Sequence, residues 1–252
     1  MFQFKDKHVF ISGGGSGIGF RVARSFLQAG AKVIISGRRE STLKKAADSL
    51  RDELKLKDEQ IRYCKANLAK SDDMKVLIDF IKSSIQTLDI VINNSGCWGL
   101  KEIAEFDADF VNDHIDNNLK TTLHGMQLAD KFMSSGGSIV NMASFAGIMP
   151  MKGASLYSAL KSSIIALTRS GASEFAQKDI RVNCVIPGVI RTPMTSDHID
   201  EHYERIIKPI ALGRVGDTQD IANGVMFLCS DYASYITGTS LDISGGKYIT
   251  QL

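Results

Sequence analysis

The chain has 252 residues, of which 44% are hydrophobic and 23% charged, and its formal net charge is +2. This is the composition of a globular protein with a substantial core, and so small a net charge argues against general binding to nucleic acids or membrane surfaces. The first residues mix charged with apolar side chains, and no apolar run approaches the roughly 18–20 residues of a membrane span. We therefore expect a cytoplasmic protein with neither a nucleic acid nor a membrane as partner.

Short apolar runs recur along the chain and predict the strands of a sheet. They are rich in β-branched residues and nearly continuous in apolar content, which is typical of strands that are covered on both faces. We place these strands at residues 8–12, 32–36, 61–66, 88–93, 138–144, 180–187 and 240–244.

Amphipathic segments separate the strands. In the first of them, Ile18, Val22 and Phe26 share one face of a helix. Helices are predicted over residues 17–29, 71–85, 108–133 and 154–177. Strands that alternate with helices indicate right-handed βαβ units. We therefore predict an α/β protein with a single Rossmann domain over residues 1–252, a doubly wound parallel sheet of seven strands with helices on both faces. Residues 190–216 fall outside the alternation, and we expect them to form a mobile helical flap over the substrate.

A glycine-rich loop follows the first predicted strand and opens the first predicted helix. Gly13, Gly17 and Gly19 allow a tight turn and a close approach of backbone N–H groups to a pyrophosphate, which the positive end of the helix also attracts. The loop lacks the Gly-Lys-Ser/Thr of a phosphate-binding Walker loop. We predict a dinucleotide site that also includes Ser16 and Ile18, the alternative being a glycine turn without a ligand.

The end of the second predicted strand indicates which dinucleotide binds. A cofactor without a 2′-phosphate usually meets an acidic residue about 20 residues after the glycines. Here Ser36 and Gly37 take that place, and Arg38 and Arg39 follow. Guanidinium groups suit a dianionic phosphate. We predict NADP(H) as cofactor, with Arg38 as the main contact and NAD(H) as the alternative. Arg39 is either a second contact or a solvated surface charge.

Several motifs together resemble the short-chain dehydrogenase/reductase family in order and spacing, over almost the whole chain. They are the glycine loop, Asn93-Asn94-Ser95-Gly96, Ser144, the Tyr157 and Lys161 pair, the run from Pro187 to Thr192, and the tail over residues 213–246. The resemblance implies a small-molecule substrate whose carbonyl is reversibly reduced to a secondary alcohol, with hydride transfer between it and a nicotinamide cofactor.

The chemistry needs these residue types. Tyr157 and Lys161 lie one turn apart on a predicted helix, and a lysine ammonium there is expected to lower the pKa of the phenol. Tyr157 is then the general acid in reduction and the base in oxidation, and Lys161 also binds the nicotinamide ribose. Ser144 donates a hydrogen bond to the substrate oxygen. Read singly, Ser144 is a strand-end cap and Tyr157 a half-buried aromatic residue.

The family resemblance adds further residues. Its helical asparagine, which supports a water chain to the lysine, matches Asn118 better than Asn117, although both read as ordinary polar helix residues without it. The other cofactor contacts that it implies, from the adenine to the nicotinamide, are Asn67, Leu68, Asn94, Ser95, Gly96, Pro187, Gly188, Ile190 and Thr192. Ser95 departs from the alanine that the family more often has.

Two further sequence features lie near the expected substrate site. His198, Glu201 and His202 match the H-x-x-E-H zinc pattern, but a flap is a poor scaffold for a metal, so we predict no metal site. Trp98 either lines the substrate cleft or is simply packed. The four dispersed cysteines indicate reduced, mostly buried thiols.

The substrate is less determined than the reaction. Similarity in length and tail to 3-oxoacyl-carrier-protein reductases favours a 3-oxoacyl thioester, with sugar or polyol, steroid-like and quinone-like carbonyls as alternatives. A non-catalytic NAD(P)-binding regulatory protein and a metal-assisted hydrolase are the rival classes. The resemblance also implies a homotetramer that packs through the two long helices and the last strand. In that region Ser244 replaces an acidic residue that the family often has before its Gly-Gly.

Overall fold

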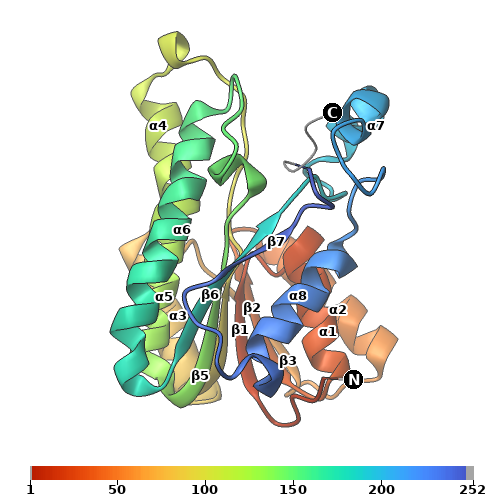
Figure 1. Cartoon of the computed structure of the whole chain (residues 1–252). Coiled ribbons are helices and arrows are strands. Elements are labelled where there is room, and N and C mark those ends of the chain that lie inside the picture. Colours follow the sequence, from red (N-terminus) through yellow and green to blue (C-terminus); the bar gives the residue numbers. More distant parts are fainter. Residues whose placement is uncertain (1, 248–252) are drawn as a thin grey trace.

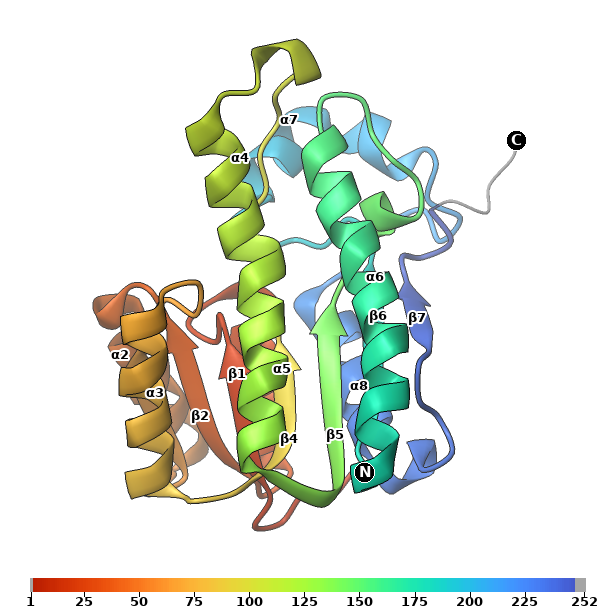
Figure 2. The ribbon, with the colours of Figure 1, turned by 90° about the vertical axis from the view of Figure 1, so that its left-hand side faces the viewer.

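The computed structural model describes residues 2–247 and places a sheet between two layers of helices (Figure 1, Figure 2). The strands are β1 (His8–Ser12), β2 (Lys32–Gly37), β3 (Ile61–Lys65), β4 (Leu88–Asn93), β5 (Met133–Met142), β6 (Arg181–Pro187) and β7 (Ser240–Ile243). The α-helices are α1 (Gly17–Gln28), α2 (Glu40–Leu54), α3 (Ser71–Ser84), α4 (Ala108–His114), α5 (Thr121–Phe132), α6 (Ser155–Phe175), α7 (Ser196–Ile207) and α8 (Thr218–Cys229).

All seven strands are parallel, in the order β3-β2-β1-β4-β5-β6-β7. The chain winds outward from β1 to β3 and then returns to the other side of β1 with β4. The boundary between β1 and β4 is therefore the point where the strand order reverses, and open α/β sheets bind ligands at the carboxyl ends of their strands there. This confirms the predicted Rossmann fold.

Each face of the sheet has its own apolar core. On one face α1 packs against α8 and α2, around residues such as Val22, Phe26 and Leu43, which are at most 1% exposed. On the other face α3, α5 and α6 cover a second core that includes Phe10, Leu77 and Val182. Because side chains point alternately to the two faces of a strand, both faces of the sheet need apolar residues, and this explains the continuous apolar runs.

The predicted strands and the four predicted helix ranges match observed elements with two local corrections, and the structure adds α2 and α8, for which the sequence analysis gives no range. The fifth strand begins at Met133, earlier than expected, and ends at Met142, so Ser144 lies just beyond it and not within it. Ser144 instead precedes a short 3₁₀ helix at Phe145–Gly147, whose Ala146 N–H donates to the Ser144 Oγ at 3.2 Å. Ser144 therefore caps this 3₁₀ helix, which agrees with the capping alternative given for it in the sequence.

The predicted long helix over residues 108–133 is interrupted. A π-helical segment, Ile115–Lys120, separates α4 from α5 along one continuous rod. π-turns are rare and occur mostly at functional sites, because the extra residue redirects side chains and frees a carbonyl. Here Thr122 Oγ1 donates to the Asn118 carbonyl at 2.9 Å and Thr121 Oγ1 to the Asn117 carbonyl at 3.0 Å, which satisfies the displaced backbone.

The stretch over residues 190–216 contains the helix α7, which stands above the carboxyl edge of the sheet. A single parallel β-bridge between Ile190 and Gly216 joins the two ends of this segment. Its helical character is as expected, and its mobility stays a prediction. In the part of the chain that the structure describes, no helix is both long and apolar enough to cross a membrane.

Candidate active site

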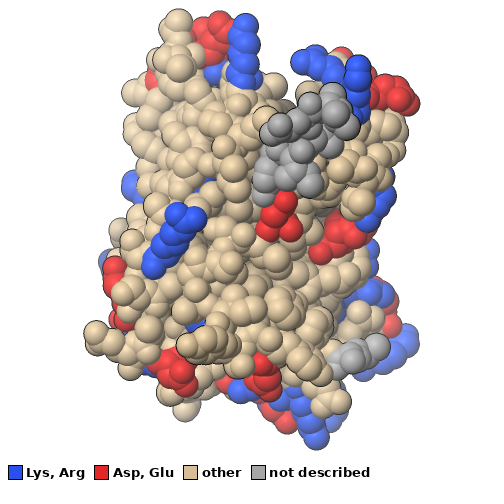
Figure 3. All heavy atoms as spheres, in the orientation of Figure 1, with Lys and Arg blue, Asp and Glu red and all other residues tan. Residues whose placement is uncertain are grey.

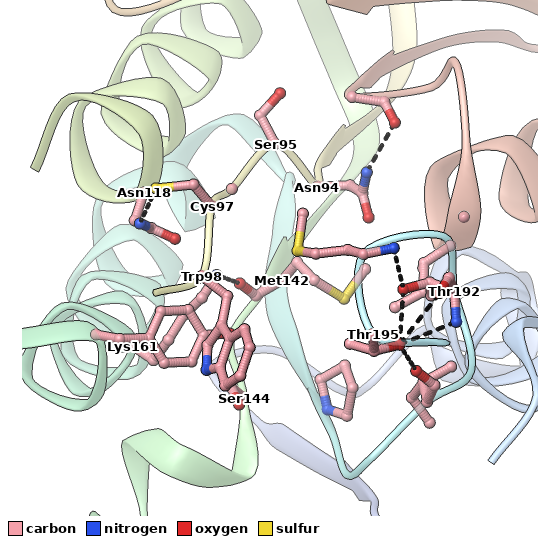
Figure 4. Close-up of a pocket in the computed structure, with 18 of the residues that line it drawn as sticks. Asn94, Ser95, Cys97, Trp98, Asn118, Met142, Ser144, Lys161, Thr192 and Thr195 are labelled. Atoms are coloured by element: carbon pink, nitrogen blue, oxygen red, sulfur yellow. Dashed lines mark hydrogen bonds between the residues drawn. The ribbon is translucent and has the colours of Figure 1, made fainter. Parts of the chain in front are cut away.

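A cavity of about 850 Å³ opens at the carboxyl ends of the strands, between the loops that follow β1, β4 and β5 and the helix α7 (Figure 4). Every residue predicted for the site lines it except Gly19. A Cβ at Gly19 would lie 2.3 Å from the Gly13 carbonyl oxygen, so Gly19 serves the close packing of α1 against the loop. The structure thus brings segments far apart in sequence to one cavity.

The glycine loop is held open toward this cavity. Gly13 and Gly17 adopt positive φ angles of 67° and 55°, which favour glycine. The Asn94 side-chain amide donates to the Ser12 and Gly13 carbonyls, each at 3.1 Å, and so fixes the loop against the end of β4. Ser16 precedes α1 without a side-chain cap. The first N–H groups of α1 therefore remain available for an anion.

Arg38 lines the cavity just beyond the end of β2. Its Nη1 donates to Asn117 Oδ1 at 3.0 Å, and Asn117 Nδ2 in turn donates to the Asp113 carboxylate at 2.8 Å. The π-helical segment that carries Asn117 thereby orients a guanidinium located beyond the end of β2. Sequence reasoning assigned no partner to Arg38, because the residues are distant in sequence and the π-turn was not expected.

Tyr157, Lys161 and Ser144 meet in the middle of the cavity. Lys161 Nζ donates to the Met142 carbonyl at 2.9 Å and lies 5.6 Å from the centre of the Tyr157 ring. The Ser144 hydroxyl lies near enough to Tyr157 to lower the pKa of its phenol, against the larger effect of burial. Lys161 is only 4% exposed, so α6 and the end of β5 hold its charge in a fixed place. The catalytic roles of these residues remain predictions, but their juxtaposition is the one that carbonyl reduction requires.

The electrostatics of the pair differ from the expectation. Burial raises the pKa of the Tyr157 phenol to about 12, against a smaller lowering by the hydrogen bond with Ser144. Burial also lowers the pKa of the Lys161 ammonium to about 8. The expected lowering of the phenol's pKa is therefore wrong in direction for this structure, because leaving water disfavours both charged forms. A phenol with this pKa stays protonated at neutral pH, as a proton donor must.

Asn118 lies on the same side of the cavity as Lys161 (Figure 4). Its Nδ2 donates to the His114 carbonyl at 3.0 Å and to Cys97 Sγ at 3.4 Å. Its buried Oδ1 has no hydrogen-bond partner among the described residues. A Cβ on Gly96 would lie 3.1 Å from that oxygen and 3.5 Å from Lys161 Nζ, so the glycine keeps a polar space open between them. An unpaired acceptor beside a cation suits the predicted water chain.

The loop after β6 is rigid through its hydroxyls. Thr195 Oγ1 donates to the Ile190 carbonyl at 2.6 Å and accepts from the Thr192 N–H at 3.0 Å (Figure 4). A Cβ on Gly188 would lie 2.6 Å from Ser244 Cα, so the loop after β6 packs tightly on the segment after β7. Sequence reasoning missed Thr195. The hydroxyl-rich run from Thr192 to Ser196 was the available signal.

A second polar group adjoins the cavity at Cys97. Cys97, Asp113 and His114 bring a sulfur, a carboxylate oxygen and an imidazole nitrogen within 4.8 Å of one another. His114 Nδ1 donates to the Phe110 carbonyl at 2.9 Å, and its buried Nε2 has no partner among the described residues. The sequence analysis did not single out this group, because its members carry no recognisable spacing. The predicted absence of a metal stays a prediction.

Trp98, His198 and His202 line the cavity, and the sequence alone left their roles open. Trp98 lines the cavity and its ring lies 5.5 Å from that of His198, so it faces the flap. His198 and His202 have ring centres 4.8 Å apart. Three cysteines, Cys64, Cys184 and Cys229, are buried thiols, and Cys97 is partly exposed in the cavity.

Comparison with known proteins places this geometry in a family. Residues 13–247 match a family model described as Enoyl-(Acyl carrier protein) reductase. The chain is 34% identical to the 3-oxoacyl-[acyl-carrier-protein] reductase FabG of Staphylococcus aureus, over 96% of this chain and 98% of that protein. It is 33% identical to a 3alpha-hydroxysteroid dehydrogenase of Mediterraneibacter gnavus, over 96% and 97%.

A solved structure from Brucella melitensis, titled short-chain dehydrogenase/reductase SDR:Glucose/ribitol dehydrogenase, superposes with a TM-score of 0.93 at 28% identity and covers 99% of both chains. Fold, motif order and sequence similarity therefore agree. The chain belongs to the short-chain dehydrogenase/reductase family and is an oxidoreductase that uses a nicotinamide dinucleotide.

Proposed function

We propose that the protein is an NADP(H)-dependent reductase that converts a 3-oxoacyl thioester into the 3-hydroxyacyl thioester. The observation that carries this proposal is the meeting of Ser144, Tyr157 and Lys161 in a cavity whose other end is the glycine loop. The residues present fit the dinucleotide. Positive-φ glycines and the free end of α1 suit its pyrophosphate, and Gly96 leaves space where a Cβ would crowd Asn118.

The reaction follows from this arrangement. The bound dinucleotide supplies the hydride for the carbonyl carbon. Ser144 and Tyr157 hold the carbonyl oxygen by hydrogen bonds, and the Tyr157 phenol transfers its proton to that oxygen as negative charge develops on it. Lys161 stabilises the phenolate that remains, and the unpaired Asn118 Oδ1 anchors a route by which the proton is replaced from solvent. In the reverse direction the same phenolate acts as the base.

The preference for NADP(H) rests on Arg38. Its guanidinium borders the cavity at the end of β2, where an acidic residue would otherwise bind a ribose hydroxyl, and Asn117 holds it in place. We predict that Arg38→Ala raises the KM for NADPH about 10–100-fold, the scale of a lost charge-assisted hydrogen bond, and leaves the KM for NADH within a factor of two. Steady-state kinetics with both cofactors measures this.

Arg39→Ala serves as the comparison for Arg38, because both side chains border the cavity. Arg39 precedes α2, and its side chain makes no capping hydrogen bond with that helix. A smaller effect of Arg39→Ala agrees with the assignment. Equal use of NADH and NADPH by the unaltered protein would refute the proposed role of Arg38.

The thioester is favoured over other carbonyl compounds by similarity to the Staphylococcus aureus reductase. The cavity's substrate end offers Trp98, Leu100, Met151, Met194 and Ile206, which suit an apolar acyl chain. The same lining also suits a steroid-like carbonyl, and the hydroxysteroid dehydrogenase relative favours that second candidate.

The test of the proposed function is NADPH consumption with matched 3-oxoacyl thioesters, steroid ketones, quinones and sugars. The highest kcat/KM on the thioesters supports the proposal, and a steroid preference replaces it with the second candidate. If none of these carbonyl compounds causes NADPH consumption, the result would favour a non-catalytic regulatory protein. A homotetramer through the α4–α5 rod, α6 and β7, and a cytoplasmic location, belong to this proposal by family resemblance.

A further inference from the structure

The charged side chains that line the cavity are of one sign. They are Arg38, Arg39, Lys152, Lys161, Arg205 and Lys247, and no Asp or Glu joins them among the described lining residues. The chain as a whole has 28 acidic and 30 basic residues, so the composition does not explain this bias. Arg38 and Arg39 serve the cofactor end, and Lys161 is central. The remaining cations lie toward the substrate end.

The helix α7 contributes His198, His202 and Arg205 to the cavity lining. Its backbone is kinked at His202, where φ is −126° and ψ is 25°. Lys and Arg side chains also flank the notch at the upper end of the molecule in the space-filling view (Figure 3). We call Arg205 and Lys247 the cationic cluster.

Arg205 and Lys247 have no acidic partner among the described residues. Their neighbours do, since Arg191 pairs with Asp200 at 2.6 Å and Arg214 with Asp220 at 2.8 Å. Lys247 is partly buried and its Nζ lies 5.2 Å from the centre of the Phe145 ring. Burial lowers the pKa of its ammonium. A cation that is withdrawn from water without a counter-ion gains stability when an anion arrives.

The cavity lining also includes apolar residues. Trp98, Met151 and Met194 line the cavity together with Tyr157 and Ser144. A ligand that contacts both Tyr157 and the cationic cluster therefore meets apolar side chains as well as positive charge, which suits an amphipathic anion. A guanidinium forms paired hydrogen bonds with either a carboxylate or a phosphate.

We propose that the cationic cluster binds the anionic end, a carboxylate or a phosphate, of an amphipathic carbonyl substrate whose carbonyl group lies at Tyr157 and Ser144. This rests on the proposed function for the position of the carbonyl. It makes substrate choice depend on charge complementarity at α7 and not on the apolar lining alone.

The test uses matched pairs of ligands with the full chain and NADPH. One pair is a 3-oxo methyl ester and the same ester with a terminal carboxylate. The other is a 3-oxoacyl N-acetylcysteamine thioester and the corresponding coenzyme A thioester, which carries phosphates. The first pair reports a carboxylate and the second a phosphate. Calorimetric binding of the four ligands is measured beside their turnover.

We expect the charged member of at least one pair to bind about 10–100-fold more tightly than its neutral counterpart, the scale of hydrogen bonds to charged groups. Arg205→Met and Lys247→Met should remove most of that advantage and change the neutral ligand less than threefold. Lys208→Met is the control, because Lys208 ends α7 outside the cavity lining.

Equal binding of the charged and neutral members of both pairs would overturn the cationic cluster as a binding site. An equal loss for both members in Arg205→Met and Lys247→Met would do the same, since it would mark a structural role. Binding that shows the charge preference without any turnover would instead reject the proposed reaction and leave the cluster standing. The two failures are therefore distinguishable.

Discussion

Replacement of Tyr157 by phenylalanine is expected to lower kcat for carbonyl reduction by about 10²–10⁴-fold, the contribution of a positioned general acid. The change removes one hydroxyl and keeps the ring, so the packing of α6 against the cavity wall is retained. Ser144 keeps its contact from the Ala146 N–H. Steady-state kinetics with the best substrate of the thioester panel measures the loss.

NADPH affinity separates a catalytic role from a structural one. Because we propose that the pyrophosphate binds at the glycine loop and the 2′-phosphate at Arg38, Tyr157→Phe should leave the Kd for NADPH within about threefold. The control substitution is Tyr232→Phe, since Tyr232 is 78% exposed and far from the cavity lining. A Tyr157→Phe protein that retains more than a tenth of the activity would contradict the assigned proton donor.

Replacement of Lys161 by methionine is expected to lower activity about 100-fold or more and to raise stability. The ammonium is buried, and its pKa of about 8 in the folded protein lies below the ordinary value of 10.5. Holding this charge in the folded state costs about 3 kcal/mol at neutral pH. Loss of the hydrogen bond to the Met142 carbonyl offsets about 1–2 kcal/mol of the gain. A net increase of about 1–2 kcal/mol corresponds to a few degrees in Tm.

The buried Lys161 charge also predicts how the free energy of unfolding depends on pH. Between pH 8 and 10.5 the unfolded chain keeps Lys161 protonated while the folded protein releases that proton. At Lys161 the unfolded state then binds more protons, so this residue's contribution to the free energy of unfolding rises with pH across the window, whereas the thiols of Cys64 and Cys229, whose pKa values burial raises, act in the opposite direction. The stability gain of Lys161→Met over the unaltered protein should therefore shrink between pH 8 and 10.5, and the corresponding difference for Lys208→Met should stay constant. A less stable Lys161→Met protein, or an unchanged pH dependence, would show that the buried charge is not the cause.

The fold was predictable because its determinants are local. Buried parallel strands need apolar side chains on both faces, so runs such as residues 88–93 stand out from the amphipathic helices between them. The glycine loop after the first strand agrees with the switch point between β1 and β4, although the strand order itself comes from the structure. Gly13 and Gly17 were also predictable, because only glycine tolerates their positive φ angles readily.

The rest of the site depends on contacts that sequence spacing does not encode. The π-helical segment shifts the helical phase after His114, and so places Asn117 against Arg38 and Asn118 beside Lys161. The direction of the Tyr157 pKa shift depends on burial, which only the assembled cavity determines. His198 and His202 match a zinc pattern in the sequence, and their spacing alone does not show that they line the cavity.

The central claim is that the Lys161 charge supports proton transfer at Tyr157, and the pH profile of kcat/KM for NADPH in the reduction direction tests it most directly. This quantity reports ionisations of the free enzyme. The account predicts a constant value at neutral pH and a decline of about tenfold per pH unit above about 8, where Lys161 loses its proton, with no such decline in the residual activity of Lys161→Met. A wild-type profile that stays flat through pH 8, or the same decline in Lys161→Met, would contradict it.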